Sequence, residues 1–184
     1  IVYSDATQGW IPESDVDVAD VPVALTQKAL FAYGYTGSYV SMSNLVNSSG
    51  VVATDVTGVG TSRSALAATG YGTDKAIFAY GTTGSLTSIS NLVSNSGVVA
   101  TDVTGVGTAR NGLAAATYGA DKAIFGYGST GSNSSLTNLV TNVGVVGSDV
   151  TGVGSARRLL AAAGYGGDKA IFGYGYAGGR TAVT

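Results

Sequence analysis

The sequence contains no cysteine and no histidine. The first absence excludes disulfide bonds and thiolate metal sites. The second removes the imidazole base of serine- and cysteine-dependent hydrolases, together with the commonest side-chain ligand of transition metals. Glutamate occurs only at Glu13, and the aspartates of the chain stand at positions typical of turns, so a pair of catalytic carboxylates is not indicated. We therefore expect no enzymatic activity, no metal and no cofactor.

Charge and proline are also scarce. Charged residues make up 11% of the chain, against about a quarter in ordinary soluble proteins. There are only two prolines but 29 glycines, and valine, threonine, tyrosine and isoleucine are abundant, which is a β-sheet composition. No apolar run approaches the ~20 residues of a transmembrane helix, and the basic residues are spread evenly instead of forming a stripe. We expect neither membrane insertion nor nucleic-acid binding.

What is present is a repeat of 47 residues. The segment DKAIFGYG at 121–128 recurs at 168–175 and, as DKAIFAYG, at 74–81, while a shortened KALFAYG stands at 28–34. A period of roughly 20 to 50 residues marks a repeat architecture. We divide the repeat domain, residues 21–184, into units at about 28–74, 75–121 and 122–168 and a partial unit at 169–184.

Within one unit, four short segments are predicted to be strands separated by turn residues. In the third copy they are 109–119, 122–128, 135–142 and 144–150. Strict alternation along the second of them would place Ala123, Phe125 and Tyr127 on one face. Four antiparallel strands in about 47 residues fit one blade of a β-propeller, so we expect an all-β repeat protein.

Most charged residues after residue 20, and the phenylalanines, recur at the same spacing of 47 residues. We interpret these positions as structural, as buried ion pairs, turn anchors or core, because charges retained among apolar strands are normally paired. They are Arg63, Arg110 and Arg157; Asp74, Asp121 and Asp168; Asp55, Asp102 and Asp149; and Phe78, Phe125 and Phe172.

Four aromatic residues that do not recur in every unit are our candidates for a surface that binds a partner. They are Tyr35, Tyr39, Tyr176 and Trp10. Trp10 belongs to the segment 1–20, which does not repeat and carries five acidic residues but no basic one. We interpret this segment as the end of a preceding module followed by a solvated linker, and the chain as a processed product or a piece of a longer polypeptide.

Each unit resembles a kelch-type propeller repeat. The resemblance lies in the arginine-led strand ARNGLAAATYG, in DKAIFGYG, where kelch repeats usually carry a glycine pair, and in NLVTNVGVVGSD. A late tryptophan of many kelch repeats is missing. The AGYGGDKAIFGYG form and the opening YSDATQGWIP are more specifically similar to structural proteins of tailed phages, especially cyanophages, and of other large viruses.

This resemblance implies a non-enzymatic virion protein at the particle surface, a tail fibre or similar appendage module that takes part in host attachment. The alternatives are a purely architectural capsid decoration or fibre-shaft module, and a glycan-binding, lectin-like module. Expected partners are other virion proteins or copies of the chain itself, with a trimer as one candidate assembly, and a host-surface glycan or receptor. For the fold, a β-trefoil and sheets completed between chains remain alternatives to the propeller, because three and a half units leave open edges.

Overall fold

A computed structural model describes residues 2–5, 9–11 and 28–184 of the chain. The described residues form twelve strands and no helix. The strands are β1 (Val2–Asp5), β2 (Gly9–Ile11), β3 (Ala29–Tyr35), β4 (Tyr39–Val46), β5 (Ala67–Tyr71), β6 (Lys75–Ala79), β7 (Ser90–Val93), β8 (Ala114–Tyr118), β9 (Lys122–Ser129), β10 (Asn133–Val140), β11 (Ala161–Tyr165) and β12 (Lys169–Gly173). None of these residues belongs to a helix long and apolar enough to cross a membrane.

All strand pairs are antiparallel and join neighbours in the sequence. β1 pairs with β2, β3 with β4 and β11 with β12, while β5-β6-β7 and β8-β9-β10 form three-stranded sheets. In three sheets a further segment is joined to the last strand by isolated bridges, such as Ser90 to Val103 and Val93 to Val99 beside β7. The all-β class predicted from the composition is therefore confirmed, in small antiparallel sheets.

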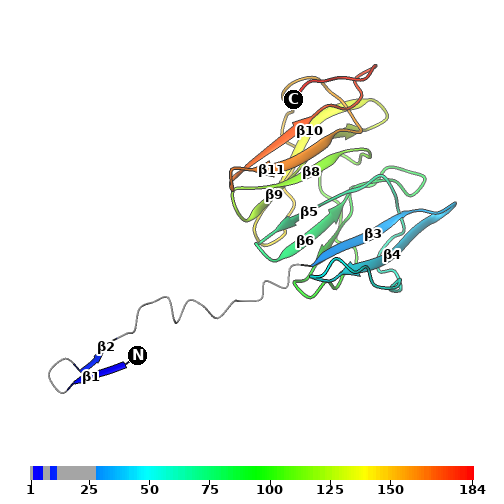
Figure 1. Cartoon of the computed structure of the whole chain (residues 1–184). Helices are drawn as coiled ribbons and strands as arrows, with labels where there is room; N and C mark the ends of the chain where they lie inside the picture. The colour runs from blue at the N-terminus through cyan, green and yellow to red at the C-terminus, as the bar shows by residue number, and fades with distance from the viewer. Residues whose placement is uncertain (1, 6–8, 12–27) are drawn as a thin grey trace.

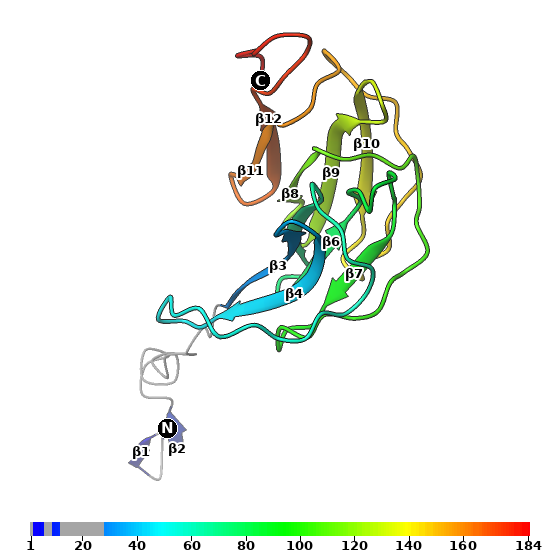
Figure 2. The same cartoon turned by 90° about the vertical axis from the view of Figure 1, so that its right-hand side faces the viewer.

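The sheets from residue 28 onward stack as four layers (Figure 1). The first layer is β3, β4 and the segment 52–56; the second is β5 to β7 with 99–103; the third is β8 to β10 with 146–150; the fourth is β11, β12 and the segment 176–183. The first strands of successive layers lie side by side, since β8 packs against both β5 and β11. Figure 2 shows the first and fourth layers at opposite ends of the stack.

Backbone hydrogen bonds tie each layer to the next. The Gly72 amide donates to the Asp121 carbonyl at 2.7 Å, and the Gly119 amide donates to the Asp168 carbonyl at the same distance. Both donors lie in the turn after the first strand of a layer, at Gly positions with φ near +58°. The turns of the Asp-Lys repeat thus connect layers as well as strands.

At the tyrosine of the repeat, the side chains change the face of the strand on which they lie. Tyr127 has φ of +62°, in the left-handed region that bulky residues seldom adopt. The register of β9 with β10 shifts beside it, which is a β-bulge. Phe125 therefore packs on the preceding layer, and Tyr127 packs on the following one. Our prediction that the two rings share one face is wrong, because strict alternation holds only for extended backbone.

The same left-handed tyrosine occurs in every layer. The φ angles lie between +62° and +65° at Tyr33, Tyr80, Tyr127 and Tyr174. The main core lies between the second and third layers, where the buried residues are Tyr71, Ile77, Ala79, Tyr80, Leu113, Ala123, Phe125 and Val140. A smaller cluster of Tyr33, Phe78 and Val93 lies between the first and second layers. The described strands close no barrel, so the topology does not support the trefoil alternative, which needs one.

The segment 1–20 is described only in part. β1 and β2 form a hairpin with Val2 opposite Ile11 and Tyr3 opposite Trp10. Residues 6–8 and 12–27 lie outside the described residues, and with them most of the predicted linker and the beginning of the first repeat.

Candidate functional site

Each junction between layers is built around one buried arginine that lies over a tyrosine ring. The arginine belongs to the start of one layer and the tyrosine to the layer before it. From guanidinium carbon to ring centroid, the distances are 4.1 Å for Arg63 on Tyr33, 4.2 Å for Arg110 on Tyr80 and 4.3 Å for Arg157 on Tyr127. A cation over an aromatic face is attracted by the ring quadrupole, and more strongly when it is shielded from water.

Arg63 shows how such a cation is held inside the protein. Its Nε donates to the Tyr80 carbonyl at 3.0 Å and its Nη1 to the Thr61 carbonyl at 3.2 Å. Its Nη2 has no hydrogen-bond partner among the described residues, so the Tyr33 ring is the main partner on that side. Burial lowers the pKa of Arg63, but a guanidinium in a protein stays protonated.

The tyrosine of each junction is fixed at both ends. The Tyr33, Tyr80 and Tyr127 hydroxyls each donate at 3.2 Å to a carbonyl of the connecting loop, at Val59, Val106 and Val153 respectively. Each ring also meets the phenylalanine of the next layer: Tyr33 with Phe78, Tyr80 with Phe125 and Tyr127 with Phe172, at 5.4 to 5.5 Å between centroids. Burial raises the pKa of Tyr33 and of Tyr80, so both stay neutral in ordinary buffers.

A second set of contacts, which we call the aspartate clasp, holds the loop that enters a layer. The Thr108 amide donates to both carboxylate oxygens of Asp149, at 3.1 and 3.0 Å, and the Thr108 hydroxyl donates at 2.6 Å. Asn138 donates to the same carboxylate at 3.0 Å. Arg110 Nη1 lies 4.0 Å from it. The clasp recurs as Thr61, Asp102 and Asn91.

The clasp changes the acidity of its carboxylates. Partial burial of Asp102 and Asp149 would raise the pKa of each, but the hydrogen bonds from threonine and asparagine outweigh burial and hold it below the usual range. In the first layer Asp55 accepts from Asn44 at 2.7 Å. These partners lie 11 and 41 residues away from their aspartates, so the carboxylates do not anchor their own turns.

The exposed Asp-Lys pairs form a third set. Asp74 is bound by Lys75 at 2.6 Å and by Asn95 at 3.2 Å, and Asp121 by Lys122 at 3.4 Å and Asn142 at 2.9 Å. Asp168 pairs with Lys169 at 2.5 Å. The hydrogen bond with Lys75 lowers the pKa of Asp74 and raises that of Lys75, while the bond from Asn142 lowers the pKa of Asp121.

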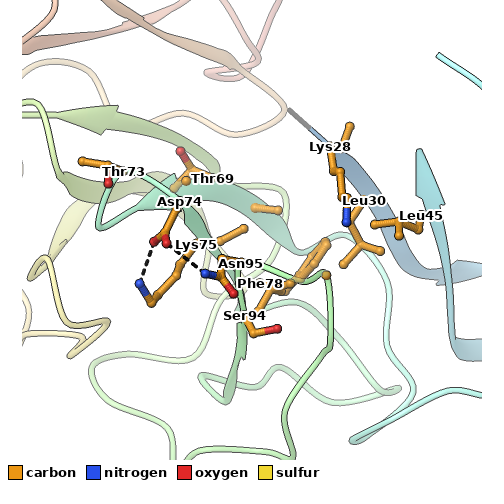
Figure 3. Close-up of a pocket in the computed structure, with 16 residues that line it drawn as sticks. Lys28, Leu30, Leu45, Thr69, Thr73, Asp74, Lys75, Phe78, Ser94 and Asn95 are labelled. Atoms are coloured by element: carbon orange, nitrogen blue, oxygen red, sulfur yellow. Dashed lines mark hydrogen bonds and ion pairs between the residues drawn. The ribbon is translucent and has the colours of Figure 1, made fainter. Parts of the chain in front are cut away.

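The Asp74–Lys75 pair borders a cavity, whereas Asp121–Lys122, its counterpart in the next layer, borders neither of the two cavities we describe. The cavity has a volume of about 790 Å³ and lies between the first and second layers. Figure 3 shows Asp74, Lys75 and Asn95 on one side and Lys28, Leu30 and Leu45 on the other. Phe78 and Val93 supply further apolar lining. A cavity of this size with apolar walls and a few polar groups is typical of a small-ligand site.

The space occupied by this cavity is filled at the next junction. Between the second and third layers, Tyr71 is buried and its ring lies against Gly144. Gly97 holds the corresponding position in the second layer, and it lines the cavity. The residue 47 positions before Tyr71 is Ala24, which lies outside the described residues. The difference between tyrosine and alanine at this repeat position is a sequence signal by which the two junctions could have been distinguished.

The four candidate surface aromatics are not brought together. Tyr35 and Tyr39 face each other across the β3–β4 turn, with ring centroids 5.3 Å apart, and Tyr35 is exposed. Tyr176 is in the fourth layer, with the Arg158 guanidinium 5.3 Å from its ring. Trp10 lies in β2. The cavity, which sequence reasoning did not identify, involves none of these residues.

A second cavity, of about 480 Å³, lies between the third and fourth layers. Its lining includes Tyr118, Tyr165 and Phe172. Among the described residues, no group of three or more acidic side chains is arranged to hold a metal ion.

The chain matches no protein-family model, and no curated protein matches it. Among solved structures it is similar to a fungal alcohol oxidase described as catalytically diverse among the AA5 family, in complex with copper. The TM-score is 0.46 at 12% identity, and the match covers 63% of this chain and 26% of that one. The chain thus spans about a quarter of the length of that oxidase, and a likeness of this size carries no argument about activity.

Proposed function

We propose that this chain is a non-enzymatic structural module of a virion appendage, such as a tail fibre, that displays a surface for host attachment. One observation supports a scaffold above all: the phased arginines, tyrosines and phenylalanines connect each layer to the next. The assignment to a virion surface rests on the resemblance of the AGYGGDKAIFGYG repeats to phage structural proteins.

We further propose that the layers are kelch-like propeller blades. Sequential antiparallel strands, a fourth segment bridged to the third, and first strands that neighbour one another along the stack all support this view. A closed ring would then be completed by further blades from another chain or from a longer polypeptide.

The use of the acidic side chains supports a non-enzymatic role. Within residues 28–184, Asp102 and Asp149 hold clasps, Asp55 accepts from asparagine, and the remaining aspartates pair with the lysine that follows them. A general acid or base must instead be free to reach a substrate and exchange a proton with it.

The virion assignment is tested by mass spectrometry of particles purified from the source culture. Trypsin releases residues 123–157 as one peptide, because no lysine or arginine lies between Lys122 and Arg157. We expect this peptide to copurify with particles through a density gradient in constant proportion to the major capsid protein. A peptide confined to the soluble fraction would contradict the proposal.

As a second candidate function, we propose that the cavity between the first and second layers binds a saccharide. Its apolar lining beside a carboxylate, an amide and two ammonium groups favours a ligand that has both apolar faces and hydroxyl groups. Several weak sites of this kind on one appendage would add up through avidity.

The repeat supplies a matched control for this candidate. Asp74→Ala and Asn95→Ala should abolish binding on a saccharide array, since both residues line the cavity. Asp121→Ala and Asn142→Ala remove the same hydrogen bond from the next layer, away from the cavity, and should leave binding unchanged. Equal loss in both pairs, or no binding by the unaltered chain, would overturn the assignment.

A further inference from the structure

The two ends of the stack expose residues that are buried at the same repeat positions inside it. In the second layer, the side that faces the third layer contains Tyr71, Ile77 and Tyr80, which are 3%, 0% and 0% exposed. The corresponding residues of the fourth layer are Tyr165, Ile171 and Tyr174, which are 54%, 45% and 61% exposed. We call these three residues the tyrosine face.

The opposite end of the stack shows the complementary set. In the third layer, Phe125 and Val140 are fully buried against the second layer, and Val146 packs beside them. The corresponding residues of the first layer are Phe31, Val46 and Val52, of which Phe31 and Val52 are exposed and Val46 is half-buried. We call these three residues the phenylalanine face.

From this complementarity we propose that the phenylalanine face of one copy of the chain docks on the tyrosine face of a second copy. The contact would continue the established interface between layers, with Phe31 against Tyr174 as Phe125 lies against Tyr80. The tyrosine side of that interface is supplied by the first two strands of a layer and the tyrosine after them, and the fourth layer possesses both strands, β11 and β12. A second, identical chain presents the matching phenylalanine face, so the two copies would join head to tail.

A second copy fits this surface better than the other end of the same chain. The first and fourth layers, to which the two faces belong, lie at opposite ends of the stack in both views (Figures 1 and 2). A head-to-tail contact uses two different patches, so it generates a ring if the rotation closes and a filament if it does not. Burial of exposed tyrosine, phenylalanine and isoleucine provides the driving force.

The contact should be weaker than an internal junction. Val16 stands 47 residues before Arg63, the arginine that begins the second layer, so the sequence provides no arginine for a stack on Tyr174. We therefore expect assembly that depends on protein concentration, in contrast to the fixed internal junctions.

The test measures mass in solution by light scattering and sedimentation velocity, with the 184-residue chain over a concentration series. The unaltered chain should rise from 18.2 kDa towards multiples of that mass. Phe31→Asp and Tyr174→Asp should each remain monomeric, and Val52→Asp and Tyr165→Asp serve as second variants of the two faces. Val143→Asp is the control, since Val143 is 70% exposed but belongs to neither face.

Mixing the variants identifies the geometry. Phe31→Asp keeps its tyrosine face and Tyr174→Asp keeps its phenylalanine face, so an equimolar mixture should form a dimer and nothing larger. A misfolded variant could not complement the other, so dimer formation also verifies folding. A monomeric unaltered chain, variants that assemble normally, or a mixture without dimers would each overturn the proposal. None of these results depends on virion location or saccharide binding, so this proposal and the proposed function fail separately.

Discussion

The two sides of the second layer are assembled from the same repeat but are packed differently. Towards the third layer, Tyr71 fills the space beside Gly144 and belongs to a continuous core. Towards the first layer, the corresponding space is a cavity beside Gly97, next to a core cluster of only three buried residues. Yet the arginine–tyrosine distances, 4.1 and 4.2 Å, and the aromatic centroid distances, 5.4 and 5.5 Å, are nearly equal on the two sides.

This difference separates two tasks within one interface. The stack of arginine, tyrosine and phenylalanine keeps nearly the same geometry on both sides of the second layer, whereas the space beside it is filled only towards the third layer. The framework that joins the layers is therefore the same whether or not the space beside it is filled.

The largest expected effect tests the shared part of the two junctions. Arg110→Ala should lower the free energy of unfolding by about 3 to 4 kcal/mol, because it removes a fully buried side chain and leaves two carbonyls without their donor. Arg63→Ala should cause a similar loss. Thermal and denaturant unfolding measure both, with the exposed Arg180→Ala as control. An unchanged melting temperature for Arg110→Ala, together with lost ligand binding, would refute a structural role for the arginine.

An intermediate effect should distinguish the filled junction from the open one. Gly97 and Gly144 have φ of +84° and +85°, so alanine is equally strained at either position, by about 1 to 2 kcal/mol. A Cβ at Gly144 would meet the buried Tyr71 ring and a terminal methyl of Leu92, each at 2.9 Å. At Gly97 it would meet a terminal methyl of Leu45 at 2.6 Å, but that flexible side chain lines the cavity and has room to move.

Gly144→Ala should therefore destabilise the protein by roughly 1 kcal/mol more than Gly97→Ala. Denaturant titrations of the two variants measure the difference directly. Equal losses would show that the first junction is as tightly filled as the second.

The smallest expected effect concerns acid. The folded-state pKa of Asp149 lies below the usual aspartate value of about 3.9, so its contribution to stability is complete above that pH and is lost as the pH falls through the folded-state pKa. Asp149→Asn should lower stability by about 1 kcal/mol at neutral pH and flatten the fall in melting temperature below about pH 4. Calorimetry between about pH 2 and 7 measures the melting temperature at each pH. If its fall below about pH 4 were the same in the variant, protonation of Asp149 would not be coupled to unfolding.

The positions of several strands could be predicted from the sequence alone. The residues that favour strands and turns act locally, and they recur every 47 residues. The strands near 114–118, 122–129 and 133–140 are of this kind. The reversal at Tyr127 could not be predicted, because a left-handed tyrosine is stabilised by its neighbours in the next layer and not by local preference.

The hydrogen-bond partners of the charged residues could not be predicted from the sequence either. Asp149 binds Thr108, which precedes it by 41 residues, and spacing alone does not show which loop returns to which carboxylate. The phase predicts that Phe31 and Phe125 are equivalent, but only the order of the layers shows that one is exposed and the other buried.

The contacts that join the layers connect only adjacent ones, and this has a consequence for how such a chain can change over generations. Recombination between near-identical DNA copies would add or remove a whole period of 47 residues, and every new layer would meet the same neighbours as the old one. The length of the stack can then vary in a single genetic step, while the residues at its two ends stay the same.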